Sequence, residues 1–252
     1  TMVRPILTSI TVTYNDLEGL KRTVRSFQEQ EATEVAHLIV DGNSTDGSKE
    51  FLNQICYPGL TVISEPDKGL YDAMNKGIQN AEGEYIQFLN AGDVFVDNQV
   101  LNRVVHALKE STADFVFGET IDVDEEGNVL GERRLQVGSR KVDWKLFRTG
   151  MRICHQAMFV KRRVAPLYNL NYQLSADFDW SIQCLKKSQS ASQLGFPVIY
   201  FEKGGLTTTR RWESLSERFK IMSKHYGFLP TLLRHLYFPI RAVLFQLKNG
   251  WH

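Results

Sequence analysis

Acidic side chains stand at two points of the sequence where a short apolar stretch ends. Asp41 follows residues 37–40 directly, and Asp93 closes a turn that begins at Asn90, after residues 86–89. A carboxylate at the mouth of a buried strand can accept a hydrogen bond from a base or a ribose, and it can hold a hard divalent cation together with phosphate oxygens. Both segments contain turn formers, so a turn or a helix cap is the alternative for each.

Two further groups, in the second half of the chain, have the chemistry of general acids and bases. His155 precedes the apolar residues 157–160, and Asp177 and Asp179 stand two positions apart at the start of an expected helix. One of the two carboxylates can act as a general base while the other orients or caps. The alternatives are a structural histidine, and two carboxylates that the helix dipole favours in a first turn.

The elements that must position these residues alternate along residues 1–110. Apolar and β-branched runs predict strands, and apolar residues at helical spacing predict the helices between them. The expected strands are residues 6–13, 37–41, 60–64 and 85–89, and the expected helices begin near Asn15 or Asp16, Asp46, Leu70 and Val100. This βαβαβαβα order predicts an α/β fold with a mostly parallel central sheet and helices on both faces. Ligands bind beyond the carboxyl ends of such strands, which is where the polar clusters fall.

The second half of the chain is less regular. Residues 115–122 and 129–135 predict a hairpin, residues 176–187 and 212–226 predict helices, and residues 198–201 predict a late strand. We therefore expect a single domain over residues 1–227, with halves 1–110 and 111–227, followed by a helical C-terminal extension over residues 228–252.

Composition excludes several classes of protein. The 252 residues are 42% hydrophobic and 23% charged, which is an ordinary globular mix, and three distant cysteines fit neither a zinc site nor a disulfide framework. There is no G-x-G-x-x-G after the first expected strand and no P-loop, which disfavours a dinucleotide dehydrogenase and a P-loop ATPase. Because no apolar run reaches about 20 residues and no signal-peptide pattern is found, we expect a cytoplasmic protein.

Charge is divided unevenly along the chain. Residues 203–252 hold nine Lys or Arg against Glu213 and Glu217, a balance of +7, whereas residues 1–202 carry 21 positive and 27 negative charges. From Leu229 onward the chain is apolar and aromatic, with scattered cations. This extension can pack on the domain as helices, or it can lie at an anionic membrane surface.

The polar clusters occur in a recognisable order. Tyr14-Asn15 is followed by DGNSTDG from Asp41, EPDKGLYDAMNKG from Glu65 and FLNAGD ending at Asp93. In this combination the chain resembles, over about residues 6–210, the family-two inverting glycosyltransferases of the A-type fold. It is most similar to small bacterial transferases of capsule, O-antigen lipopolysaccharide and colanic-acid pathways. The resemblance implies a hexosyltransferase-type enzyme that moves a sugar from a nucleotide-diphosphate sugar to a saccharide hydroxyl in surface polysaccharide biosynthesis.

The resemblance also implies roles for single residues. Asp177 matches the catalytic base, with Asp179 left open as the alternative, and Asp93 matches the last Asp of the motif that holds Mn²⁺ or Mg²⁺. The implied nucleotide- and donor-binding residues are Thr13, Tyr14, Asn15, Asp41, Asp67, Lys68, Tyr71, Asp72, Asn75, Asn90, Gly92, His155, Arg210 and Arg211. Asp41 would bind the base, taken as uracil, or neighbouring groups of the nucleotide, and the two arginines would contact the diphosphate.

The expected partners follow from the same resemblance. Residues 1–110 would be the nucleotide-binding half, and residues 111–227 the acceptor and catalytic-base half. The acceptor would be lipid-linked, and the extension would lie on the inner face of the cytoplasmic membrane; no nucleic acid is expected. Asn90 and Gly92 stand where the family motif has Asp. This departure supports one alternative, a catalytically inactive transferase-like subunit of a membrane polysaccharide assembly complex. A sugar-phosphate nucleotidyltransferase is disfavoured, because residues 13–16 lack its Gly-rich loop.

Overall fold

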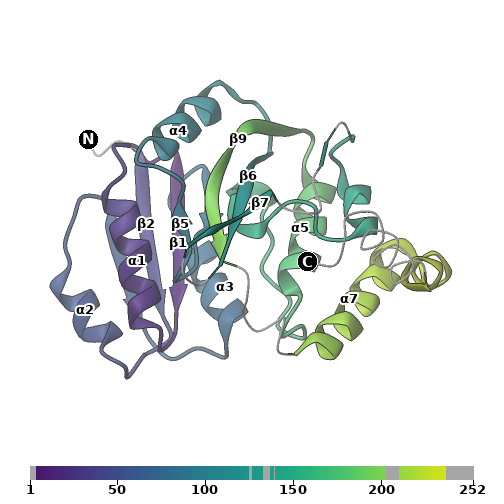
Figure 1. The fold of residues 1–252 in the computed structure, drawn as a ribbon, viewed down its shortest axis with the longest axis horizontal. Coiled ribbons are helices and arrows are strands. Elements are labelled where there is room, and N and C mark those ends of the chain that lie inside the picture. The colour runs from purple at the N-terminus through teal and green to yellow at the C-terminus, as the bar shows by residue number, and fades with distance from the viewer. Residues whose placement is uncertain (1–3, 125–126, 133–136, 139, 203–209, 237–252) are drawn as a thin grey trace.

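The computed structural model describes residues 4–124, 127–132, 137–138, 140–202 and 210–236. The strands are β1 Leu7–Thr13, β2 Val35–Asp41, β3 Leu60–Ser64, β4 Tyr85–Phe88, β5 Val94–Phe95, β6 Phe115–Val123, β7 Val129–Glu132, β8 Met158–Lys161 and β9 Ala191–Glu202. The α-helices are α1 Leu17–Gln28, α2 Ser48–Gln54, α3 Leu70–Asn80, α4 Val100–Glu110, α5 Ala176–Lys187 and α7 Arg211–Tyr226. Three short 3₁₀ helices are η1 Trp144–Thr149, η2 His155–Ala157 and η3 Arg162–Val164. In this described part, the strands form one sheet, and α2 and α7 lie at opposite ends of the molecule (Figure 1).

The first four strands form a parallel block. β1 lies between β2 and β4, and β3 lies outside β2, with a helix in each connection. The register pairs Thr13 with Asp41, and Asp41 with Ser64. The last residues of three neighbouring strands therefore stand side by side, at the carboxyl edge where the sequence predicts the site.

The rest of the sheet is mixed. β8 joins β4 to β6 by antiparallel pairing, β9 runs parallel to β6, and β5 is antiparallel to β9. The predicted hairpin is confirmed for β6 and β7, while residues 125–126 and 133–135 lie outside the described part. The α/β class is confirmed, but among the described strands parallel pairing is confined to the block β3-β2-β1-β4 and to the pair β6-β9.

Buried side chains divide between the two faces of the sheet. Ile10 and Phe88 point to the face covered by α3 and α5, where Met74 and Trp180 complete a cluster. Leu7 belongs to a second cluster, together with buried residues of α4. The division follows from the two-residue period of strands. Because α3 and α5 cover the same face, their first turns can approach each other near the carboxyl edge.

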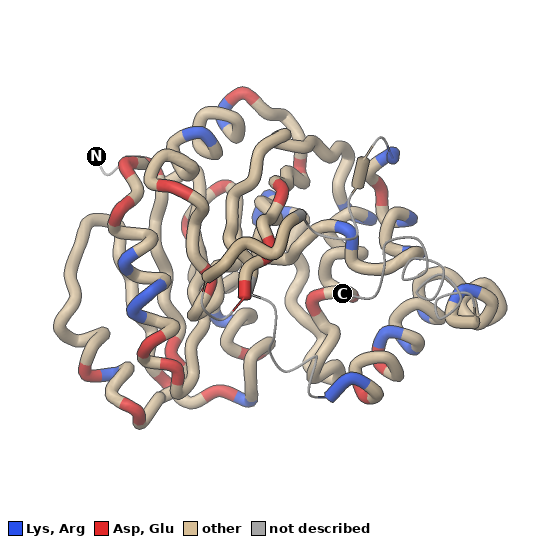
Figure 2. The backbone as a smooth tube through the Cα atoms, viewed as in Figure 1, with Lys and Arg blue, Asp and Glu red and all other residues tan. Residues whose placement is uncertain are grey.

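The sequence-based bounds hold for most elements. The predicted strand at 60–64 and the predicted helix at 176–187 coincide with β3 and α5, whereas the late strand is longer than predicted and begins at Ala191. Residues 228–236 are helical, and the remaining part of the predicted extension, 237–252, lies outside the described residues. None of the described helices combines the length and the apolar character that crossing a membrane requires. Lys and Arg recur along α7 (Figure 2).

Candidate functional site

The loop after β2 is organised around a buried carboxylate. Asp41 is 0% exposed, and its Oδ1 accepts from Ser44 Oγ at 2.5 Å while its Oδ2 accepts from Ser64 Oγ at 2.7 Å. The backbone N–H of Ser44 also lies 3.2 Å from both oxygens. Two neighbouring serines and a backbone amide therefore satisfy the carboxylate from inside. The predicted contact of Asp41 with a nucleotide stays a prediction.

Asn15 ties the loop after β1 to the loop after β2. Its φ of 51° lies in the left-handed region, which Asn tolerates better than most residues. Its N–H donates to Ser44 Oγ at 2.8 Å, and its Oδ1 accepts from the N–H of Thr45 at 2.8 Å. The side chain of Asn15 thus holds the two loops in register, next to any ligand at this edge.

Three loops meet at Gly42. A Cβ at this glycine would lie 2.5 Å from Asp67 Oδ2 and 3.1 Å from Tyr14 Cδ2, so these side chains flank the bare backbone closely. Tyr14 is 65% exposed, and the buried Thr13 Oγ1 has no hydrogen-bond partner among the described residues. An exposed ring beside a carboxylate and an unpaired hydroxyl can stack on a planar ligand and bind its polar edge.

The start of α3 carries an exposed cation. The backbone N–H of Lys68 donates to Asp72 Oδ2 at 2.9 Å, and that of Gly69 donates to Asp67 Oδ1 at 2.8 Å. These two carboxylates are therefore partly used to shape the turn that begins the helix. The ammonium group of Lys68 forms no ion pair with any residue in the described ranges, so it is available to an anion.

Asn75, in the middle of α3, binds the backbone of a distant segment. Its Oδ1 accepts from the backbone N–H of Tyr168 at 2.6 Å, and its Nδ2 donates to the carbonyl oxygen of Tyr168 at 3.1 Å. Asn75 is 8% exposed. The amide thus binds a segment 93 residues away. The donor-binding role that the sequence predicts for Asn75 stays a prediction.

The turn after β4 has an unpaired oxygen. The N–H of Asn90 donates to Asp93 Oδ2 at 3.2 Å, and Thr23 Oγ1 binds the carbonyl oxygens of both residues. Gly92 has a φ of 95°, a conformation that strains any L-residue, including the Asp of the family motif. Asn90 Oδ1 is buried without a hydrogen-bond partner. Nowhere in the described ranges do three His, Cys, Asp or Glu side chains gather as a metal cluster.

The two candidate bases face different neighbours. Asp177, half-buried in the first turn of α5, accepts from Tyr71 OH of α3 at 3.3 Å (Oδ1). Burial, and then the charge of Asp177, raise the pKa of Tyr71 well above its ordinary value, so its hydroxyl keeps the proton it donates. Asp177 therefore stands where the two halves of the chain meet.

Asp179 is engaged elsewhere. It is 1% exposed, with Oδ1 at 2.6 Å from His225 Nε2 of α7 and Oδ2 at 2.6 Å from Gln183 Nε2. Burial raises the pKa of Asp179, but the hydrogen bond from His225 and the charge of Lys224 outweigh this and hold the pKa below its ordinary value. Positions i and i+2 of a helix point in different directions, which explains why the two carboxylates do not share a site.

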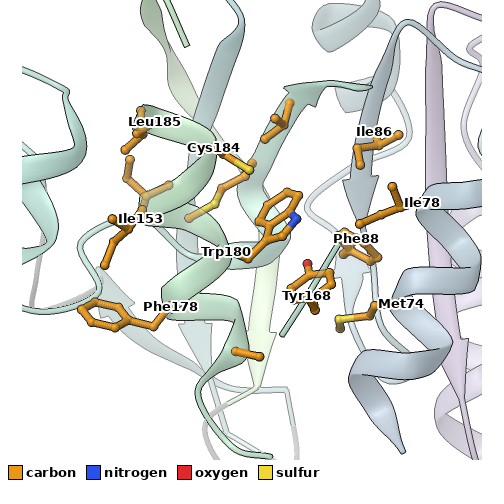
Figure 3. Close-up of a cluster of buried hydrophobic side chains, with 14 of the residues drawn as sticks. Met74, Ile78, Ile86, Phe88, Ile153, Tyr168, Phe178, Trp180, Cys184 and Leu185 are labelled. Atoms are coloured by element: carbon orange, nitrogen blue, oxygen red, sulfur yellow. The ribbon is translucent and has the colours of Figure 1, made fainter. Parts of the chain in front are cut away.

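His155 belongs to an aromatic cluster. Its Nε2 is 2.6 Å from Tyr168 OH, and its ring stacks on Phe88 with centroids 5.1 Å apart. Burial lowers the pKa of His155 to about 4, against an opposing effect of Asp177, so the imidazole is neutral near pH 7. Figure 3 shows Tyr168 and Trp180 in the cluster, facing Phe88. This placement is that of a packed structural histidine. The donor-binding role that the resemblance implies for His155 stays a prediction.

Arg210 and Arg211 stand at the start of α7 and are exposed. Arg210 Nε donates to Glu213 Oε1 at 3.0 Å, one turn along the chain. The preceding residues 203–209 lie outside the described part. The predicted diphosphate contact of the two arginines therefore stays a prediction.

Comparisons with known proteins agree with one another. The sequence model described as glycosyl transferase family 2 matches residues 8–165. A PGL/p-HBAD biosynthesis glycosyltransferase of Mycobacterium bovis is 31% identical over 219 residues, which are 82% of this chain and 81% of the relative. An uncharacterized glycosyltransferase of Mycobacterium tuberculosis is 33% identical over 186 residues, 71% of this chain and 68% of the relative.

Two solved structures have a similar fold. S. aureus TarS 1–349 in complex with UDP-GlcNAc has a TM-score of 0.72 at 16% identity, covering 92% of this chain and 73% of that chain. The mannosyltransferase PcManGT from Pyrobaculum calidifontis, in complex with GDP-Man and Mn²⁺, has a TM-score of 0.63 at 19% identity, covering 100% and 77%. At these identities the similarity concerns the fold alone.

Proposed function

Because the chain belongs to glycosyl transferase family 2 and is a nucleotide-sugar glycosyltransferase with the A-type fold, we propose that it transfers the sugar of its donor, with inversion, to a saccharide hydroxyl. One observation carries this proposal, the 3.3 Å contact between Tyr71 OH and Asp177 Oδ1. It connects α3, which begins beside the strand ends, to the half-buried carboxylate at the start of α5. This supports Asp177 as the proton acceptor opposite a donor bound at the strand ends.

The donor would occupy the carboxyl edge of the parallel block. We propose that the Tyr14 ring stacks on the base while Thr13 and Asp67 bind its polar edge, and that Lys68 contacts the diphosphate. The close approach of Tyr14 and Asp67 to Gly42 supports this arrangement. Asp41 would act by holding the loop rather than by direct contact. The TarS structure contains UDP-GlcNAc, which favours uridine diphosphate as the first nucleotide to test.

The proposed reaction is a single displacement. The acceptor hydroxyl gives its proton to Asp177 as its oxygen bonds to the anomeric carbon. The bond from that carbon to the diphosphate oxygen breaks, and the electron pair leaves with the nucleoside diphosphate. Tyr71 would keep Asp177 oriented through its hydroxyl, which remains protonated because of its raised pKa.

A divalent cation fits the turn after β4. Asn90 offers a buried, unpartnered oxygen, and the Asp93 carboxylate lies in the same turn. Two such hard oxygens suit Mg²⁺ or Mn²⁺, which usually take further ligands from waters and substrate phosphates. We propose that Asn90 and Asp93 hold the ion. When bound, it supplies charge neutralisation on the departing diphosphate.

The acceptor is proposed to be lipid-linked, with the enzyme bound peripherally to the inner face of the cytoplasmic membrane. Leu229, Leu233 and Leu236 repeat at helical spacing on the helix at 228–236 and are 64%, 60% and 63% exposed. An exposed apolar stripe on a basic segment suits an anionic lipid surface. It would bring the acceptor half of the enzyme to lipid-borne saccharides.

Calorimetric titration tests the donor site. UDP, GDP and dTDP are titrated into the protein with Mn²⁺ and then with EDTA. We expect metal-dependent binding of one nucleotide, UDP by preference, and loss of the metal effect in Asp93→Ala. The matched control is Asp97→Ala, a nearby carboxylate that is half-exposed and pairs with Arg103.

The other outcomes separate the alternatives. Binding that is equally tight in EDTA would contradict the proposed metal site at Asn90 and Asp93, but it would agree with the proposed nucleotide site. Absence of binding in both conditions would contradict the proposed donor site. It would favour the inactive assembly subunit, which the Asn90 and Gly92 departures support.

A further inference from the structure

The segment that leads into α5 is held by a side chain from another helix. Glu217, on α7, accepts three backbone hydrogen bonds: Oε1 from the N–H of Gln173 at 2.8 Å, and Oε2 from the N–H groups of Leu174 and Ser175 at 2.9 Å each. Asp177 lies two residues beyond Ser175. The carboxylate therefore fixes the backbone that leads directly into the helix carrying the proposed base.

The usual N-cap hydrogen bond, from a side chain at the start of the helix, is missing from α5 itself. Ser175 is the N-cap residue, and its side chain makes no capping hydrogen bond. Its Oγ lies 3.2 Å from Ser214 Oγ of α7 instead. Of the three N–H groups that Glu217 binds, that of the N-cap Ser175 stands at the helix start, where N–H groups have no partner within the helix. An ionised carboxylate is a strong acceptor for such groups, because the bonds are charge-assisted and the helix dipole favours negative charge near the N-terminus.

α7 holds α5 at a second point. His225, two turns after Glu217, binds the buried Asp179, and Lys186 Nζ lies 2.9 Å from His225 Nδ1. The two contacts, one to residues 173–175 before α5 and one to Asp179 within it, stand on either side of Asp177 in the sequence. Rotation or translation of α5 against α7 would break at least one of them, so α7 determines where Asp177 can point.

We propose that Glu217 is a positioning residue for Asp177, acting through the backbone of residues 173–175. The inference rests on the proposed role of Asp177 as the base. It assigns to α7 a part in the chemical step, which the motifs of the sequence do not indicate. Displacements of about 1 Å at a reacting group can reduce a rate by up to about 10²-fold, so the loss of these three hydrogen bonds should be measurable.

The experiment compares Glu217→Ala and Glu217→Gln with Asp177→Asn and with Glu110→Gln. Glu110 is an exposed carboxylate at the end of α4 and controls for the loss of one negative charge. Nucleoside diphosphate release from UDP-GlcNAc and GDP-mannose is followed with short alkyl glycosides or water as acceptor. Nucleotide Kd is measured by calorimetry, and exchange of the amides of residues 173–175 is measured by mass spectrometry.

We expect Glu217→Ala to lower kcat about tenfold while the donor KM and the nucleotide Kd stay within about twofold. Glu217→Gln should fall between, because its amide oxygen still accepts but its amide nitrogen does not. Faster exchange at residues 173–175 should accompany both changes. A merely structural role would not produce this graded fall in kcat at constant Kd.

Three results would overturn the inference, and they are distinguishable. A wild-type kcat in Glu217→Ala, together with an inactive Asp177→Asn, contradicts the positioning role of Glu217 but agrees with Asp177 as the base. Full activity in Asp177→Asn removes the proposed base, and the role of Glu217 with it. Unchanged amide exchange in Glu217→Gln, a variant that preserves size and packing, shows that the carboxylate does not hold the backbone.

Discussion

Replacement of Asn75 by Ala distinguishes a structural from a ligand-binding role for this residue. The sequence predicts that Asn75 contacts the donor, whereas in the structure its amide binds the backbone N–H and carbonyl of Tyr168 at 2.6 and 3.1 Å. Tyr168 is 3% exposed, and its ring stacks on Tyr71 and Trp180. Asn75→Ala therefore leaves two buried backbone groups without partners beside the aromatic cluster.

The expected cost follows from those two groups. A buried donor or acceptor that loses its partner costs about 1–3 kcal/mol. Two such groups, with some relief from water entering at the 8% exposed side chain, give a loss of roughly 3 kcal/mol in the free energy of unfolding. For a domain of this size, 1 kcal/mol moves the Tm by about 2–4 °C, so a fall of roughly 6–12 °C is expected.

Urea and thermal unfolding followed by circular dichroism measure this loss, and calorimetry measures nucleotide affinity on the same samples. The control is Asn80→Ala, at the exposed end of α3, which removes one hydrogen bond from Nδ2 to the Lys76 carbonyl. We expect that change to cost less than about 0.5 kcal/mol. The nucleotide Kd of Asn75→Ala, below its Tm, should remain within about twofold of the wild-type value.

The opposite pattern would refute the reasoning. If Asn75→Ala unfolds within about 1 kcal/mol of the wild type while its nucleotide affinity falls tenfold, the amide contributes to the donor site and not to the binding of the Tyr168 backbone. The sequence-based role of Asn75 would then be correct. Asn75→Asp should destabilise at least as much as Ala at neutral pH, because it sets an acceptor against the Tyr168 carbonyl.

Two further predictions concern pH and the C-terminal extension. Burial lowers the pKa of His37 to about 3 and of His155 to about 4, so between pH 6.5 and about 4 the unfolded chain binds protons that the folded chain does not. The free energy of unfolding should therefore fall on acidification, by up to about 1.4 kcal/mol per pH unit for each histidine. Urea titrations at several pH values should show that this free energy depends less steeply on pH in His155→Gln than in His106→Gln. Equal slopes in the two variants would contradict a buried neutral imidazole at His155. Liposomes containing anionic phosphatidylglycerol should float the full chain several-fold better than a chain ending at Gly227, and equal flotation would contradict membrane binding through residues 228–252.

The elements that could be predicted from the sequence are those whose pattern is local. β3 and α5 have the predicted bounds, because apolar periodicity and flanking polar residues are readable within a dozen positions. β5 and β8 were not predicted. They are two and four residues long, and their partners β9 and β4 are far away in the sequence, so pairing rather than propensity determines them.

The site shows the same limit. The gathering of polar loops at the strand ends could be predicted, because parallel strands bring their carboxyl ends together. The direction of each side chain could not. Asp41 points inward because the hydroxyl of Ser64, on the next strand, donates a hydrogen bond to it. Asn75 binds a backbone segment 93 residues away. Glu217 belongs to no motif, and a lone acidic residue on a periodic helix gives no signal of the backbone N–H groups that it binds.

The position of β9 within the sheet has a consequence for synthesis of the chain. β9 lies between β6 and β5, and Phe95 of β5 pairs with Ile199. About 100 residues separate these partners, so at ~5–20 residues per second β5 waits roughly 5–20 s on the ribosome for its neighbour. The parallel block β3-β2-β1-β4 has all its internal pairings by residue 88. This parallel block is thus available to fold first, and the half that bears Asp177 waits with open strand edges until the late strand emerges.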